Sequence, residues 1–560
     1  MLQSQNHMIF DKLYPHSYRP YLLQKIDLIF ASFVFLISLA VYFKTLNPSV
    51  TAGDSGELIT TVYSMGASHP PGFPLYGIIG KLFTFLRFSD IGYKMNIFSG
   101  VSAAVAVLFT YLSSVKLLGF NKDVKYFEFS VHIPALAASL LFAFSKAHWS
   151  QAIMAEVYAL NAALSSIMFF IMIIWYEEVM SHRGEEDDLW LAPRITFLLA
   201  FVMGLSITNH QIPVWYIISW ALTLIPIMII LISFKGKDFI LQFEERKLPL
   251  ILLGIVCVMA LFLLVISAIK PYMLFPDLLS GDYRLIFKEH VPYILVAILC
   301  VPIWLTFYSI QNYLYKLERY SSINKNILEI FHSIFFILVL GVIAYAFVFL
   351  GGVNGIIVCV PLMIITIYQL SQRQDLHKRH RNNWVDNFLF ILTIAMWLLI
   401  FAVSIYLYMW IRAKAIAPLV EPKPLSWGDT QTLDILFNHM LRKQYPVGSD
   451  DYNNLIGQIG ALWQYHINQF GLTNVILGIG GLIYFIKREP VQAGYFILSS
   501  MLYLWTIVEF INFEVDPRSM ETQEVFFIQQ FLVFAIFVGF AYQFILEIPN
   551  RIQDYSKRKK

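Results

Sequence analysis

Apolar stretches of about 20 residues recur along the whole chain, and most lysines and arginines fall in the polar segments between them. Each stretch is long enough to cross the hydrocarbon core of a bilayer as one helix. The short alternating segments of a transmembrane barrel are absent from the sequence. The pattern predicts an all-α polytopic membrane protein with about 14 spans, at 27–46, 95–118, 130–147, 155–179, 195–208, 212–234, 248–268, 291–310, 328–350, 355–370, 388–410, 472–486, 492–511 and 525–547.

The composition agrees with this class. The chain of 560 residues is 58% hydrophobic and 14% charged, whereas about a quarter of the residues of a soluble domain are charged. A net charge of +3 is too small to suggest a nucleic-acid partner. Cys257, Cys300 and Cys359 all fall inside apolar spans, so we expect neither a disulfide framework nor a zinc site. The first span lacks a small-residue cleavage site and is interpreted as a retained anchor.

One apolar segment, 73–88, is ambiguous because it carries Lys81 and Arg87. If it does not cross and the N-terminus is cytoplasmic, 25 of the 40 basic residues fall in cytoplasmic loops and 9 in outer loops. If it crosses, every later loop changes sides and the bias reverses. Because cytoplasmic loops are enriched in lysine and arginine, we expect this segment to re-enter or to lie along the outer interface as a surface helix.

This topology suggests three parts. Residues 1–410 would form a transmembrane core whose first outer loop is 47–94. Residues 411–471 would form a small extracytoplasmic segment, and 472–560 the last transmembrane helices with a basic cytoplasmic tail.

Ionisable residues near the spans gather at the outer ends. Ion-coupled transporters normally hold such groups near the midplane, often in broken helices. The distribution here favours an active site at the outer interface over a translocation path. The candidates are Asp54, Glu57, His69, Glu156, His210 and Arg412, with Glu509 and Glu514 near the last outer loop.

Each candidate also has a structural explanation. Asp54 and Glu57 match a capping box, although their spacing also places both carboxylates on one helix face. The run from His69 to Gly72 can be a rigid turn, and Glu156 can mark a helix start. Arg412 can be a snorkelling anchor, and His210 taken alone is better explained as a satisfied interface histidine. Their shared side of the membrane is the argument for function.

The sequence has no phosphate-binding loop of the Gly-x-x-x-x-Gly-Lys type, no His-Glu-x-x-His and no Cys-x-x-Cys. An enzyme that works outside the cytoplasm has no ATP supply. Its substrate must therefore arrive already activated, and a site at the membrane suggests that the activated group is carried on a lipid.

Six motifs in these regions resemble those of the domain of unknown function 2723 family, also classed as glycosyltransferase family 117. They are "GDSGEL", "HPPGFPLYGIIGKLF", "NIFSG", "EVYALN", "GLSITNHQ" and "YMWIRAKAIAP", and the outer segment "WGDTQTLDILFNHMLRKQY" is also similar. The family includes transmembrane protein 260-like protein O-mannosyltransferases. The resemblance implies a GT-C-type bundle with the catalytic carboxylate in the first outer loop, and a polyprenyl-phosphate sugar donor, with mannose as the expected sugar.

The leading hypothesis is an inverting glycosyltransferase that moves this sugar to a hydroxyl of a protein, with a glycan as the other possible acceptor. Asp54 would be the general base and Glu57 would orient the acceptor. His69, Glu156 and His210 would bind substrate, and Arg412 would hold the lipid phosphate. We expect no cofactor and no metal. The membrane would be a bacterial plasma membrane with the site facing outward, or that of the endoplasmic reticulum in a eukaryote. The alternative is a lipid or solute transporter or flippase without catalysis.

Overall fold

The computed structural model describes residues 20–120, 122, 124, 126–181, 192–220, 222–223, 306, 383–414, 425–444, 455–507 and 515–559. Its elements are α2 (Lys25–Thr45), α3 (Ser55–Ser64), α4 (Pro74–Thr84), α5 (Ile91–Gly119), α6 (Phe129–Ala143), α7 (Lys146–Ala152), α8 (Val157–Ser181), α9 (Pro193–Asn209), α15 (Asn383–Val403), η3 (Ser404–Tyr406), α16 (Leu407–Lys414), α17 (Leu433–Met440), α18 (Leu455–Arg488), α19 (Pro490–Thr506), α20 (Pro517–Gln523), η5 (Glu524–Phe527) and α21 (Ile528–Lys559).

The expected class is confirmed: the protein is an all-α polytopic membrane protein. Within the described residues six helices are long and apolar enough to cross a membrane, or seven if α6 and α7, bent by 64°, are one broken span. The total of 14 spans stays a prediction. The expected spans between 248 and 370, the three cysteines, Glu509 and Glu514 lie outside the described residues.

The chain divides into two compact units. The first holds residues 1–182, 201–270 and 401–560, and the second holds 183–200 and 271–400. In the second unit, Trp397 of α15 donates its indole N–H to Thr306 at 2.6 Å.

Six of the described helices form the centre of the first unit. α5 packs against α2, α6 and α8, and α21 packs against α6 and α18. Close approach of α18 and α21 requires a residue without a side chain, because a Cβ at Gly481 would lie 1.8 Å from the Phe537 carbonyl oxygen. Small residues at helix contacts are how membrane helices gain van der Waals packing where lipid removes the hydrophobic driving force.

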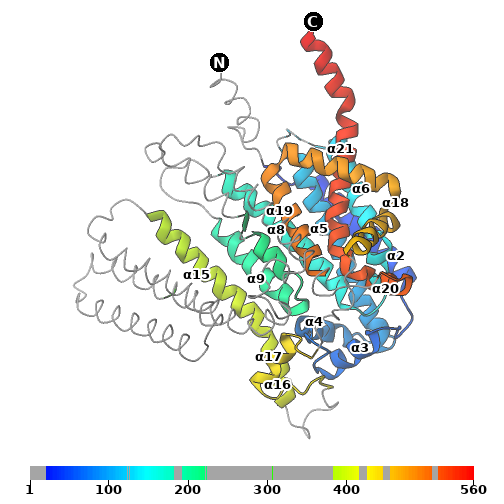
Figure 1. Cartoon of the computed structure of the whole chain (residues 1–560), viewed down its shortest axis with the longest axis vertical. Helices are drawn as coiled ribbons and strands as arrows, with labels where there is room; N and C mark the ends of the chain where they lie inside the picture. Colours follow the sequence, from blue (N-terminus) through cyan, green and yellow to red (C-terminus); the bar gives the residue numbers. More distant parts are fainter. Residues whose placement is uncertain are drawn as a thin grey trace, which may run out of the picture. The chain divides into compact units, whose positions relative to one another are not determined.

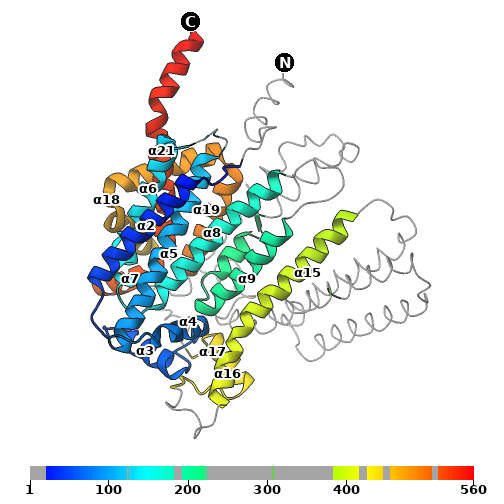
Figure 2. The same cartoon turned by 180° about the vertical axis from the view of Figure 1, so that it is seen from behind.

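Four short helices gather at one end of this bundle. Figures 1 and 2 both place α3, α4, α16 and α17 there, while the chain leaves α21 at the opposite end. α4 has 11 residues, which extend only about 16 Å, so it is too short to cross a bilayer of about 30 Å. The ambiguous segment thus holds a helix of surface length, with Leu82 and Phe85 exposed.

The outer segment differs from expectation in one respect. We expected the next span to begin near residue 472, but α18 already begins at Leu455 and its helical geometry is interrupted at Gly471, where φ is +74°. A left-handed φ is open to glycine at no steric cost. The apolar pattern marks only the part after the break, because the helical turns before it are more polar.

Candidate active site

Asp54 stands immediately before α3, and its carboxylate does not cap that helix. Its backbone carbonyl accepts the first helical hydrogen bond, from Leu58 at 2.9 Å. Its side chain makes no capping hydrogen bond and is 58% exposed. The capping-box interpretation of this motif is therefore not what the structure contains, and the Asp54 carboxylate faces open space.

Glu57, one turn later on α3, holds His69. Its Oε1 accepts a hydrogen bond from the His69 backbone N–H at 2.6 Å and lies 3.1 Å from His69 Nδ1. The opposite ring nitrogen, Nε2, lies 3.8 Å from Asp54 Oδ2. The imidazole thus sits between the two carboxylates, with Nδ1–H donating to Glu57 and Nε2 directed at Asp54.

The proline-rich turn places the His69 ring. The Gly72 N–H donates to the His69 carbonyl at 2.8 Å, and Phe73, the N-cap residue of α4, has φ +45°. Phe73 meets the His69 ring at 5.1 Å between centroids and stacks on His210 at 6.1 Å. The centroid of the Trp427 ring lies 6.3 Å from that of the His69 ring, in an edge-to-face arrangement.

Glu156 adds a third carboxylate to the same place. It directly precedes α8 and is buried. Its Oε1 lies near Gly53, the neighbour of Asp54, because a Cβ added to Gly53 would be 3.8 Å from it. Burial, followed by the charge of Asp54, raises the pKa of Glu156 to about 8. Desolvation and a like charge both favour the neutral acid, so Glu156 keeps a proton at neutral pH while Asp54 stays exposed.

His210 is buried behind this cluster. Its Nδ1 accepts a hydrogen bond from the Ile212 N–H at 3.3 Å, which leaves Nε2 as the donor of a neutral ring. Burial, followed by the charges of Arg442 and His69, lowers the pKa of His210 to about 3. The ring is therefore a fixed neutral group that contacts Phe73, and we expect it to position the turn.

The outer segment closes over the His69 turn. The Ala67 N–H donates to the Leu425 carbonyl at 3.1 Å, and the Trp427 N–H donates to the Ala67 carbonyl at 2.9 Å. A Cβ at Gly66 would lie 1.7 Å from the Leu425 oxygen, so this pairing requires glycine there. His439 on α17 donates from Nε2 to the Ser68 carbonyl at 3.0 Å.

Arg412 lies at the far end of α3 from Asp54. Its Nε and Nη2 donate to the carbonyls of Met65 and Ser64 at 2.9 and 3.2 Å. Because α3 has 10 residues, its two ends are about 15 Å apart. The structure brings together Asp54, Glu57, His69, Glu156 and His210, and Arg412 instead binds the C-terminal carbonyls of α3.

Three residues at the site were not selected from sequence: Trp427, His439 and Arg442. Arg442 brings a positive charge to this region, and that charge contributes to the lowered pKa of buried His210. It follows α17, and Gln211, next to His210, donates to the Met440 carbonyl beside it. All three fall within the outer motif that resembled the family, which was the available signal, but nothing in that motif distinguishes them from its other polar residues.

These observations define an integral membrane protein with a cluster of carboxylates and histidines at one end of its helical bundle. Residues 54–234 match the family model described as "Protein O-mannosyl-transferase TMEM260 N-terminal domain". The chain is 28% identical over 210 residues to "Protein O-mannosyl-transferase tmem260" of Dictyostelium discoideum, which is 37% of this chain and 23% of that protein. It is 31% identical over 193 residues to "Protein O-mannosyl-transferase TMEM260" of Mus musculus, which is 34% of this chain and 25% of that protein.

The region 54–234 is therefore similar to the N-terminal domain of the TMEM260-like family, the family that its motifs resemble. The chain spans about a quarter of the length of the curated relatives it matches. No solved structure matches it. Of the six residues to which the hypothesis gives a role, the matched region contains all except Arg412.

Proposed function

We propose that the protein is a membrane O-mannosyltransferase that transfers mannose from a polyprenyl-phosphate donor to a serine or threonine hydroxyl of a protein at the extracytoplasmic face. The observation that carries this proposal is the exposed Asp54 carboxylate, which lies beside a histidine held by Glu57. That geometry falls inside the region shared with relatives named protein O-mannosyl-transferases.

In the proposed reaction the acceptor oxygen attacks the anomeric carbon of mannose while its proton passes to Asp54. The bond between that carbon and the phosphate oxygen breaks, and polyprenyl phosphate leaves with the electron pair. A single displacement inverts the anomeric configuration. Asp54 suits the base because it is exposed and free of capping, whereas Glu57 is occupied by two donors from His69.

Neutral Glu156 and cationic Arg442 complete the proposed assignment. A protonated Glu156 beside Asp54 avoids a third negative charge and can donate to a substrate oxygen. A guanidinium matches phosphate oxygens and stabilises the charge that develops on a leaving phosphate. We assign this role to Arg442 because its charge acts on His210, which is buried behind the cluster, whereas Arg412 binds the carbonyls at the far end of α3.

The test is transfer by the purified full-length chain in liposomes that contain mannosyl-phosphoryl-polyprenol, with a serine- and threonine-rich peptide outside. We expect a mannosylated peptide by mass spectrometry, with the anomeric configuration opposite to that of the donor. Transfer from GDP-mannose without lipid donor would contradict the donor assignment. Movement of the donor between leaflets without peptide product would instead identify a flippase.

A further inference from the structure

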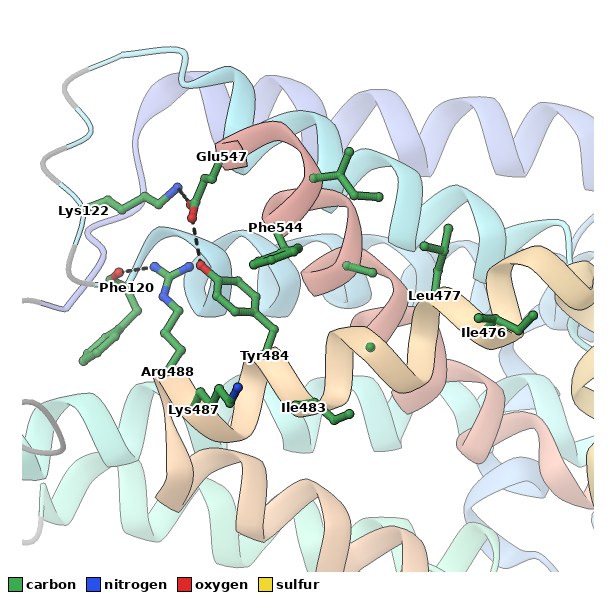
Figure 3. Close-up of a pocket in the computed structure, with 13 residues that line it drawn as sticks. Phe120, Lys122, Ile476, Leu477, Ile483, Tyr484, Lys487, Arg488, Phe544 and Glu547 are labelled. Atoms are coloured by element: carbon green, nitrogen blue, oxygen red, sulfur yellow. Dashed lines mark hydrogen bonds and ion pairs between the residues drawn. The ribbon is translucent and has the colours of Figure 1, made fainter. Parts of the chain in front are cut away.

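A cavity lies far from the acidic site, at the opposite end of the first unit. It has a volume of about 710 Å³ and lies between α18 and α21, beside the residues that follow α5. Figure 3 shows it from the side of these helices. α5 runs between the two ends and has 29 residues, which extend about 44 Å. A molecule bound here is therefore out of reach of Asp54 and is not the reacting donor.

One part of the cavity is apolar and open to the outside of the bundle. Its walls include Ile476, Ile483, Phe544 and Ile545, whose side chains are 59%, 52%, 41% and 44% exposed. These residues belong to helices that are candidate membrane spans. The open side therefore faces acyl chains, and Gly480 deepens the groove because it has no side chain.

The other part is polar and carries excess positive charge. The lining holds Lys122, Lys487 and Arg488 against one carboxylate, Glu547. Figure 3 shows Lys122, Arg488 and the Tyr484 hydroxyl gathered around Glu547, away from Ile476 and Leu477. The three cations leave a net charge of +2 at the end of an apolar groove.

Glu547 neutralises only one of these cations. Its Oε1 lies 2.6 Å from Lys122 Nζ, and its Oε2 accepts from the Tyr484 hydroxyl at 2.8 Å. Arg488 donates to the Leu118 carbonyl at 3.0 Å and also to Phe120 and Gln543. These acceptors are uncharged, so none of these hydrogen bonds neutralises the Arg488 charge.

Lys487 is the exposed cation of the cavity. It stands next to Arg488 at the end of α18, where that helix leaves its apolar stretch. Lysine in such a place extends its stem over apolar surface and its ammonium toward the headgroup layer. Basic pockets between transmembrane helices are suited to acidic lipid headgroups.

We propose that this cavity, lined by α18, α21 and Lys122, is a binding site for an anionic glycerophospholipid. Its phosphate lies at Lys487 and Arg488, and one acyl chain lies along Ile476, Ile483 and Phe544. In the orientation expected from the basic residues, this end of the bundle faces the cytoplasmic leaflet. The lipid ties α18 to α21 there and stabilises the bundle from the end opposite to the acidic site.

The test compares phosphatidylglycerol with phosphatidylcholine, each titrated onto the delipidated full-length chain in detergent, with lipid retention measured by mass spectrometry. We expect preferential retention of phosphatidylglycerol and a higher melting temperature in its presence. Lys487→Gln should weaken this retention roughly fivefold, since one lysine near an anionic surface contributes about 1 kcal/mol. Lys25→Gln is the control, because Lys25 is exposed at the start of α2.

A second variant tests the groove itself. A Cβ at Gly480 meets nothing within 4 Å, so Gly480→Leu should fold while its side chain fills the groove and excludes the acyl chain. Gly460→Leu, on the same helix, equally unobstructed and outside the cavity lining, should leave retention unchanged. Equal retention of both lipids, or full retention by Gly480→Leu, would overturn the proposal. Displacement of phosphatidylglycerol by equimolar polyprenyl phosphate would overturn it as well, because it would make this a site for the donor lipid.

Discussion

His69 and Glu57, 12 residues apart in sequence, are joined twice: the backbone N–H and Nδ1 of His69 lie 2.6 and 3.1 Å from Oε1 of Glu57. This contact turns the imidazole so that Nε2 faces Asp54 at 3.8 Å. The two carboxylates therefore differ in role: Glu57 holds the turn, and Asp54 remains accessible.

Asp54→Asn should remove transfer and leave the fold intact. Asparagine keeps the size of the side chain, and Asp54 makes no capping hydrogen bond that could be lost. A positioned general base contributes typically about 10²–10⁴-fold, so kcat should fall within that range at an unchanged melting temperature. Asp90→Asn is the matched control, because Asp90 does cap α5 through the Tyr93 N–H and asparagine also caps well. Turnover near the wild-type rate in Asp54→Asn would exclude this carboxylate as the base.

Glu57→Gln should lower both stability and activity. Glutamine retains an acceptor for the His69 N–H but loses the charge, and hydrogen bonds to charged groups contribute about 1.5–3 kcal/mol. The Glu57 side chain is 23% exposed, so we expect the lower part of that range. A double-mutant cycle with His69→Gln, read by thermal melting, should be non-additive. Additive losses would mean that the two side chains act separately.

Arg412→Ala and Arg442→Ala should separate anchoring from donor binding. Arg412→Ala removes the bonds to the Ser64 and Met65 carbonyls, so the melting temperature should fall. Arg442→Ala should raise the KM for the lipid donor about tenfold or more, because a charge-assisted hydrogen bond to the donor phosphate is lost. Arg442→Lys should recover part of the affinity. A donor KM that rises only in Arg412→Ala would restore Arg412 as the phosphate ligand.

Glu156 should make the protein less stable as the pH rises above neutral. Its folded pKa of about 8 lies above its ordinary 4.5, so the folded state binds the proton more tightly than the unfolded state. The contribution is fully present below pH 4.5 and is lost as the pH rises through about 8. Glu156→Gln, which stays neutral, should lose less melting temperature between pH 6 and 9 than the wild type. Parallel pH profiles of the two proteins would show that Glu156 is ionised throughout.

Cysteine labelling should establish the orientation. In a background without the three native cysteines, a cysteine at Ser89, after α4, should react with a membrane-impermeant maleimide in intact cells. A cysteine at Tyr126, which is 83% exposed, should react only after permeabilisation. The reason is the excess of basic residues in the loops expected to be cytoplasmic. The reverse labelling pattern would place the acidic site on the cytoplasmic side.

The sequence by itself determined the class of the protein and most of the described helices, and it indicated the family that residues 54–234 resemble. Helix formation in a membrane depends on local apolar length, because each helix satisfies its own backbone hydrogen bonds. The short helix at 74–84 was also foreseen as a non-spanning segment, through the distribution of basic residues. The motifs beginning at Asp54 were sufficient to indicate the family, because they are contiguous stretches of sequence.

Only the tertiary structure decided which side chains meet. In the sequence, Asp54 and Glu57 match a capping box as well as they match a catalytic pair. The folded turn decides between them, because it brings the His69 N–H and ring to Glu57. His439 and Ser68, joined at 3.0 Å, are 371 residues apart, and Arg412 reaches α3 across a similar separation. Such contacts are set by how helices pack, and packing depends on shape and spacing summed over the whole chain. No local pattern carries that information, which is why the partners of these residues were visible only once the chain was folded.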